Sequence, residues 1–264
     1  MFINLWVNIF VFIFGLCIGS FLNCVIYRLE KKEKLAGRSY CPQCKNTLSW
    51  SDLFPVFSFL CLWGKCRYCS KKISWQYPIV EIATGILFVL VFGSLGFDWK
   101  LGIGIWDLIR MCFMFYVASA LIIIFVYDLK YYIIPDKILL PAIGIAFAFR
   151  LFENFSSIPN LIIATLVGSG FFLFIFLISG GSWMGFGDVK LAILMGLLLS
   201  FPNILLALFL AFFLGAVMGV IMMIFKGKKL RSELPFGPFL ITGTFIALLW
   251  GSQIVQWYLN YFQI

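Results

Sequence analysis

The sequence predicts an all-α polytopic membrane protein of about eight transmembrane helices, with a small zinc-binding cytoplasmic domain inserted between helices 1 and 2. Three observations predict this fold class. The chain of 264 residues is 63% hydrophobic and only 12% charged, whereas a soluble domain carries about a quarter charged residues. The hydrophobic residues form long runs of the length that spans a bilayer. The one sizeable polar segment contains two close pairs of cysteines.

The first apolar run, residues 1–27, has no basic start and no small-residue cleavage site. It therefore predicts a retained transmembrane helix rather than a cleaved signal peptide. Residues 28–79 form the long loop after this helix, and residues 80–264 hold the other seven helices. The eight spans are expected at about 4–26, 80–97, 104–127, 133–150, 159–180, 186–201, 203–225 and 238–262. The fourth and sixth are short, and each has an acid at its start, Asp136 and Asp188.

The basic residues predict the orientation of these helices. If the loop after the first helix is cytoplasmic, 17 of the 20 Lys and Arg residues lie on that face, and Lys100, Arg110 and Arg150 do not. This asymmetry agrees with the positive-inside rule and predicts that both termini are external. Topology explains the net charge of +9, so we expect no nucleic-acid partner. We expect membrane lipid as a partner and a membrane as the location.

The cysteine pairs of the loop have the spacing of a metal site. Cys41 and Cys44 form one CxxC, and Cys66 and Cys69 form the second. Two such pairs are typical of a four-cysteine tetrahedral zinc site with no open coordination position, so the zinc would be structural. Four unligated thiols or a redox CxxC pair are the alternatives. A short loop needs such a metal to fold, which favours zinc.

Histidine is absent from the chain, which excludes Ser-His-Asp, Cys-His and His-metal chemistry. Any hydrolytic chemistry would have to use Asp, Glu, Lys, Ser or Cys, or a bound cofactor. Asp128 ends the third predicted helix, which runs inward, and Asp188 starts the sixth, which runs outward. The two acids therefore reach the same face at the same depth. Ionisable groups at membrane depth are functional candidates.

Two facing carboxylates that share one proton can act as an aspartic-protease dyad. Gly185 and Gly187 would let a substrate backbone approach closely. The alternative for Asp188 is an N-cap, with Lys190 reaching to the membrane surface. A cap is the favoured interpretation for Asp136, and a local ion pair is the simple one for Asp107 and Arg110. A cap does not explain Asp128, because a helix C-terminus disfavours an anion.

The chain resembles the bacterial prepilin peptidases, which are type IV leader peptidases and N-methyltransferases of the GxGD group of membrane aspartic proteases. The resemblance covers nearly the whole chain in order, through GSFLNCVIYR, CPQC, GKCRYC, KISWQYPIVE, YDLKYYIIPD, GFGDVKL and PFGPFL. It implies that Asp128 and Asp188 are catalytic. It also implies cleavage of prepilin or pseudopilin leaders after a glycine at the cytoplasmic face, followed by N-methylation from S-adenosylmethionine.

The resemblance further implies that residues 28–79 serve methylation and that residues 80–264 form the peptidase. Lys130 and Leu139 depart from the family pattern, and the stretch 50–60 lacks a usual Asn before its Pro. No S-adenosylmethionine motif is present. Arg28 and Glu81 are candidates for that site, with an ion pair or a phospholipid contact as equal alternatives for each.

Two other functions are weighed against this one. The chain could be a peptidase only, with the cysteine loop docking the substrate. It could instead be a small proton-coupled transporter, since acids within a membrane also suit proton relays. The acids gather at one face and no inverted repeat is present, which disfavours transport. The sequence does not distinguish among pilus, type II secretion and competence precursors.

Overall fold

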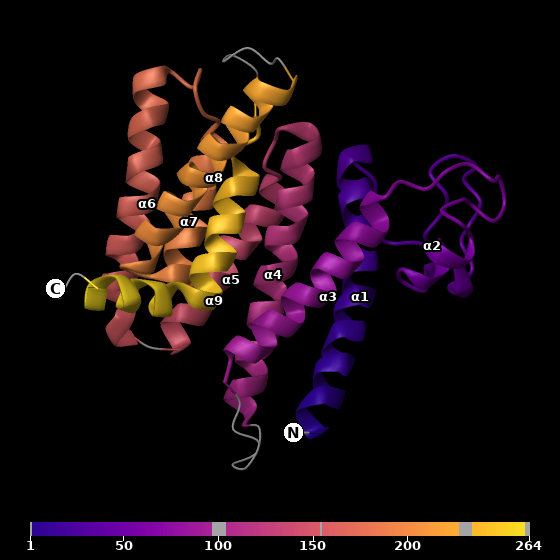
Figure 1. Ribbon diagram of the computed structural model, residues 1–264, viewed down its shortest axis with the longest axis horizontal. Coiled ribbons are helices and arrows are strands. Elements are labelled where there is room, and N and C mark those ends of the chain that lie inside the picture. The colour runs from indigo at the N-terminus through magenta and orange to yellow at the C-terminus, as the bar shows by residue number, and fades with distance from the viewer. Residues whose placement is uncertain (1, 97–103, 154, 227–233, 262–264) are drawn as a thin grey trace. The chain divides into compact units, whose positions relative to one another are not determined.

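The computed structural model describes residues 2–96, 104–153, 155–226 and 234–261, and these residues form helices without strands. Two isolated β-bridges, Tyr40 to Thr47 and Lys65 to Lys72, lie in the first loop. The elements are α1 (Phe2–Lys31), η1 (Trp50–Leu53), α2 (Phe57–Cys61), α3 (Gln76–Ser94), α4 (Ile105–Tyr131), α5 (Asp136–Glu153), η2 (Phe155–Ser157), α6 (Ile158–Ser179), α7 (Phe186–Leu199), α8 (Asn203–Lys226) and α9 (Gly237–Tyr261) (Figure 1).

Six of these helices are long and apolar enough to cross a membrane by length and composition: α1, α3, α4, α6, α8 and α9. They correspond to six of the eight predicted spans. Helices also form at the other two predicted positions, as α5 and α7. Helix α7 has 14 residues and is about 21 Å long, shorter than the hydrocarbon core of a bilayer. A crossing by α5 or α7 therefore stays a prediction.

The chain divides into two compact units, residues 1–123 and residues 124–264. In the first unit α1 packs along α3, and glycines allow a close approach. A Cβ on Gly15 would lie 2.7 Å from Cα of Gly85, and a Cβ on Gly19 would lie 2.7 Å from Cα of Glu81. Small residues at such crossings are typical of membrane helices. The rings of Phe88 and Phe115 stack with centroids 4.3 Å apart and join α4 to this core.

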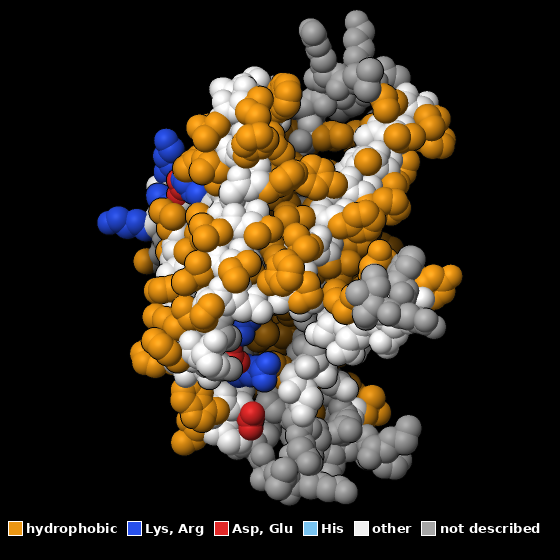
Figure 2. All heavy atoms as spheres, turned by 90° about the vertical axis from the view of Figure 1, so that its left-hand side faces the viewer, with side chains coloured by type: hydrophobic (Ala, Val, Ile, Leu, Met, Phe, Trp, Pro, Cys, Tyr) orange, Lys and Arg blue, Asp and Glu red, His pale blue; other side chains and the backbone are white. Residues whose placement is uncertain are grey.

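The second unit has α7 as its central helix, in contact with α5, α6, α8 and α9. Nearly all residues of α7 from Asp188 to Leu199 are buried. Protein therefore surrounds most of this helix. The face of α6 is different: Figure 2, which views the side where α6 lies, shows hydrophobic side chains over most of the surface. Exposed side chains of α6 include Ile162, Leu166, Phe174 and Leu177, as expected of a helix in lipid.

Partners from two neighbouring helices satisfy the buried end of α7. The Arg150 guanidinium of α5 donates to the carbonyl oxygens of Leu197 at 3.0 Å and Leu198 at 2.5 Å. The Asn160 side chain of α6 accepts the Phe201 N–H at 2.7 Å and donates to the Phe201 carbonyl at 3.1 Å. The last carbonyls of a helix lack partners within it, so these contacts allow α7 to end inside the protein. Arg150, predicted to lie away from the cytoplasmic face, has this structural role.

Several residues used for the orientation lie outside the described residues, namely Lys100, Lys228, Lys229 and Arg231. Asp107 accepts the Gly104 N–H at 3.0 Å and so supports the start of α4.

Candidate active site and candidate metal centre

Asp128 lies in the last turn of α4 and is only 4% exposed. Its carboxylate accepts the backbone N–H of Gly237, the first residue of α9. A Cβ on Gly237 would lie 2.5 Å from Oδ2 of Asp128, so a glycine is required here. The partial positive charge at the start of α9 favours an anion. This contact explains how a carboxylate is accommodated at the C-terminus of α4.

Asp188 is the third residue of α7 and is 8% exposed. Its carboxylate accepts the backbone N–H of Gly185, the N-cap residue of the same helix. Asp188 is therefore not the N-cap of α7, which is Gly185, but its carboxylate contacts that cap from the third helical position. Asp188 also lies close enough to Asp128 for their charges to interact. The structure thus brings together two acids that are 60 residues apart in sequence, both largely shielded from solvent.

The two glycines of the GFGD sequence have different surroundings. A Cβ on Gly185 would meet no atom closer than 3.9 Å, whereas a Cβ on Gly187 would lie 3.0 Å from Cβ of Ile134. Gly185 therefore has open space on its side-chain face. Gly187 allows the first turn of α7 to pack against the segment that leads into α5.

A salt bridge joins the starts of α5 and α7. The Lys190 ammonium lies 2.9 Å and 2.8 Å from the two carboxylate oxygens of Asp136. The bridge is partly exposed, with 24% of the Lys190 side chain and 52% of the Asp136 side chain accessible. Lys190 lies two residues after Asp188 in α7, and Asp136 is the first residue of α5, so this bridge holds the two helix starts together.

The four cysteines of the loop gather at one point. The Sγ atoms of Cys41, Cys44, Cys66 and Cys69 all lie within 4.8 Å of one another. Zinc–sulfur bonds of about 2.3 Å in a tetrahedron separate the sulfurs by about 3.8 Å. The four thiols therefore fit a zinc ion, and all four ligand positions would be protein sulfurs. Cys17, Cys24, Cys61 and Cys112 lie outside this cluster.

The two cysteine pairs repeat the same backbone turn. The Cys41 N–H donates to the Asn46 carbonyl at 3.0 Å, and the Cys66 N–H donates to the Lys71 carbonyl at 2.9 Å. The fourth residue after each first cysteine has a positive φ, 61° at Lys45 and 56° at Ser70. Each turn therefore presents its two thiols in the same way.

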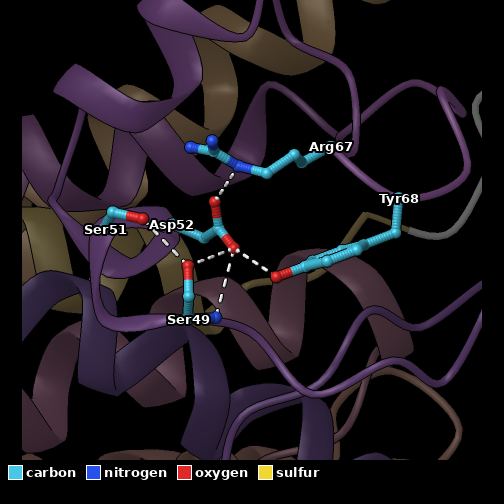
Figure 3. A network of polar contacts seen from close by, with 5 residues as sticks. All are labelled: Ser49, Ser51, Asp52, Arg67 and Tyr68. Atoms are coloured by element: carbon cyan, nitrogen blue, oxygen red, sulfur yellow. Dashed lines mark hydrogen bonds and ion pairs between the residues drawn. The ribbon is translucent and has the colours of Figure 1, made fainter.

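A polar network ties the segment between the cysteine pairs to the second pair (Figure 3). The Asp52 carboxylate accepts hydrogen bonds from Ser49, from Arg67 at 2.7 Å and from Tyr68 at 3.2 Å. Burial alone would raise the pKa of Asp52, but these hydrogen bonds outweigh it and lower the pKa below its ordinary value. Asp52 is therefore held as a carboxylate in the centre of the loop.

Arg28 and Glu81 both have protein partners. The Arg28 guanidinium is buried and donates to carbonyls of residues 34–38, including Ala36 and Gly37, each at 3.1 Å. The Glu81 carboxylate accepts the Val56 N–H at 2.7 Å. Val56 has φ 60°, an unfavourable value for a β-branched residue. Each side chain thus fixes the path of the loop.

Comparison with known proteins gives a consistent result. Residues 13–95 match the Bacterial Peptidase A24 N-terminal domain, and residues 115–220 match the Type IV leader peptidase family. The prepilin leader peptidase/N-methyltransferase of Aeromonas hydrophila is 32% identical over 96% of this chain and 93% of its own. The proteins with the same description in Pseudomonas aeruginosa and Bacillus subtilis are each 31% identical over 94% of this chain, and over 91% and 96% of their own.

The chain belongs to the type IV leader peptidase family. No solved structure matches it. The predicted resemblance is confirmed, and so is the prediction of an enzyme, a peptidase with methyltransferase activity.

In this leader peptidase, one residue beside the acids was given no role by the sequence. Gly237 belongs to the PFGPFL stretch, but a backbone N–H has no signature in a sequence. The available signal was a glycine between two prolines at the start of an apolar run, where a helix begins. Such a start is a site for an anion, and Asp128 occupies it.

Proposed function

We propose that this leader peptidase cleaves the leader of prepilin or pseudopilin precursors after a glycine, at the cytoplasmic face of the bacterial inner membrane. Asp128 and Asp188 would perform the cleavage. The observation that carries the proposal is the meeting of these two buried carboxylates, each supported by the N–H of a glycine at a helix start. The names of the relatives supply the substrate class.

The chemistry follows from the proximity of the two acids. Two buried carboxylates whose charges interact cannot both be charged without a large cost, so we expect the pair to retain one proton. The charged member takes a proton from water as the water attacks the scissile carbonyl. The protonated member donates a hydrogen bond to the carbonyl oxygen. The tetrahedral intermediate then collapses, and a carboxyl proton passes to the leaving amine.

The surroundings of Asp188 support the approach of a substrate. The open side of Gly185 lies next to the carboxylate, so an extended peptide could pass there with little steric hindrance. Ile134 covers the side of Gly187, which would leave one side of this turn for the substrate.

We assign methylation to residues 28–79, with the zinc ion as a structural staple, and cleavage to residues 80–264. S-adenosylmethionine would supply the methyl group to the new N-terminal amine. Arg28 and Glu81 would shape the loop from within, because both already have protein partners. In this arrangement the loop and the acids face the cytoplasm, and both termini are external.

The test is to replace Asp128 and Asp188 singly by Asn and to measure leader cleavage in membranes. Removing one member of a catalytic unit typically costs about 10³-fold or more in rate. We expect this loss in both variants, while methylation of a precursor that is already cleaved continues. Full cleavage by either variant would show that the pair is not the catalytic dyad. Asp107→Asn, on the same helix as Asp128, is the matched control.

A further inference from the structure

A strongly apolar stretch interrupts the polar cysteine loop. It comprises residues 50–63, WSDLFPVFSFLCLW, and we call it the aromatic segment. Six of its large hydrophobic side chains are exposed: Trp50, Leu53, Phe54, Phe57, Leu60 and Trp63. Trp63 is 88% exposed, whereas Phe59 points inward and is 8% exposed. So much exposed aromatic surface is typical of a binding surface.

The aromatic segment presents no available charge. Its single charged residue is Asp52, whose side chain is 4% exposed and is bound by Arg67 and Ser49 (Figure 3). The loop's cations lie outside the segment, where Lys65, Lys71 and Lys72 are exposed. The loop therefore has an apolar part that basic residues flank.

A hydrogen bond holds the aromatic segment beside the second turn of α3. The Val56 N–H donates to the Glu81 carboxylate, and Glu81 is five residues into α3, or about 7 Å along its axis. Helix α3 is one of the six helices suited to cross a membrane. The segment thus returns toward the bilayer after leaving it. Figure 1 agrees, since α2 lies well below the level at which α1 ends.

The exposed aromatic surface continues onto the outer face of α3. The rings of Phe59 and Trp75 have centroids 5.0 Å apart, and Trp75 is exposed just before α3 begins. Ile79, Ile82 and Ile86 are exposed along one side of α3, which is the spacing of a single helix face. That face meets lipid if α3 crosses the membrane.

We propose that the aromatic segment is an interfacial membrane anchor that binds the lipid leaflet on the side where the cysteine loop emerges. Tryptophan and phenylalanine side chains favour the boundary between headgroups and acyl chains. The flanking lysines would lie at the level of anionic headgroups, which attract them. The anchor would hold the cysteine loop against the membrane with no need for substrate or methyl donor.

The test uses tryptophan fluorescence of the full chain in lipid nanodiscs, without precursor or S-adenosylmethionine. The emission of Trp63→Phe is subtracted from that of the unchanged chain to isolate Trp63. We expect lipids brominated near the ester end of their acyl chains to quench most of this difference, and aqueous iodide to quench little of it. Trp50→Phe provides a second, independent position. Both substitutions conserve an aromatic ring at an exposed site, so the fold is retained.

Asn46→Trp provides the matched control, because Asn46 is an exposed residue in the first cysteine turn. Its added emission should show the reverse, with quenching by iodide and little by brominated lipid. The anchor is refuted if iodide quenches most of the emission that comes from Trp63 and Trp50, and brominated lipid quenches little of it. The anchor is also refuted if the emission of Trp63 and Trp50 becomes protected from iodide only after a precursor is added. That result would indicate a substrate-docking surface. Neither result depends on the proposed catalytic chemistry.

Discussion

The four thiols of the cysteine loop come from residues 41–69, whereas the two carboxylates come from α4 and α7 and take a partner from α9. The loop places its groups by two repeated turns and local hydrogen bonds. The carboxylates are placed by the ends of long helices that pack in an apolar interior. A site made of residues close in sequence therefore depends on its own loop, whereas a site made of helix ends depends on the packing of a whole unit.

The largest expected difference between the two regions comes from removing two of the four clustered thiols, which are the proposed zinc ligands. Cys41→Ser combined with Cys44→Ser should unfold the loop, since such small domains fold only with their metal. We expect methylation to be lost while leader cleavage continues. The measurement is label transfer from S-adenosylmethionine and cleavage of the same precursor. Cys17→Ser is the control, and equal loss of both activities would contradict the separation.

Gly237→Ala tests the second of the two regions, the carboxylate site. The added methyl group would lie 2.5 Å from a carboxylate oxygen of Asp128, so the carboxylate must move. A displacement of about 1 Å at a catalytic group can cost about 10²-fold in rate, and we expect a loss of that order in cleavage. Gly219→Ala, where an added Cβ meets no atom within 4 Å, is the matched control. Unchanged cleavage in Gly237→Ala would remove α9 from the site.

A smaller effect is expected within the loop. Asp52→Ala leaves the Ser49, Arg67 and Tyr68 donors without their shared acceptor. Because Arg67 and Tyr68 are about half-exposed and water can replace the acceptor, each lost hydrogen bond costs about 0.5–1.5 kcal/mol. The loop should release its metal at a lower chelator concentration, with cleavage unchanged. Arg67→Lys, which keeps the charge, should lose less. Metal release at the same concentration in Asp52→Ala and the unchanged chain would show that the network is not needed.

The smallest effect concerns the bridge between α5 and α7. Lys190→Gln removes a partly exposed ion pair with Asp136, and such pairs contribute about 0.2–1 kcal/mol. Cleavage should fall by about 1.5- to 5-fold, with less sensitivity to salt than in the unchanged chain, because salt screens the ion pair that only the unchanged chain has. Exchange of the two charges, Lys190→Asp with Asp136→Lys, should restore part of the rate. A loss as great as that of the aspartate variants would mean that Lys190 acts directly on the substrate.

Patterns of composition were enough to predict the helices, because apolar runs and charge bias follow directly from the bilayer. The family was also predicted, from motifs in a fixed order. The meeting of Asp128 and Asp188 could be inferred because opposite helix directions bring their ends to one face. These inferences need only the direction and the length of each helix.

Contacts made by backbone atoms could not be predicted. Gly237 supports Asp128 through an N–H that every non-proline residue has, and Arg28 binds the carbonyls of its own loop. Composition also could not decide whether α7 crosses the membrane, since a buried core helix and a membrane span have the same apolar composition. Arg150 and Asn160 end this helix through contacts that only the packed structure reveals.

The repeated turn at Cys41 and at Cys66 has a consequence for the residues between the two cysteine pairs. Each turn closes with the same hydrogen bond and supplies two of the four clustered thiols. A metal held by both turns would close residues 45–65 into a loop and so limit the conformations open to the aromatic segment.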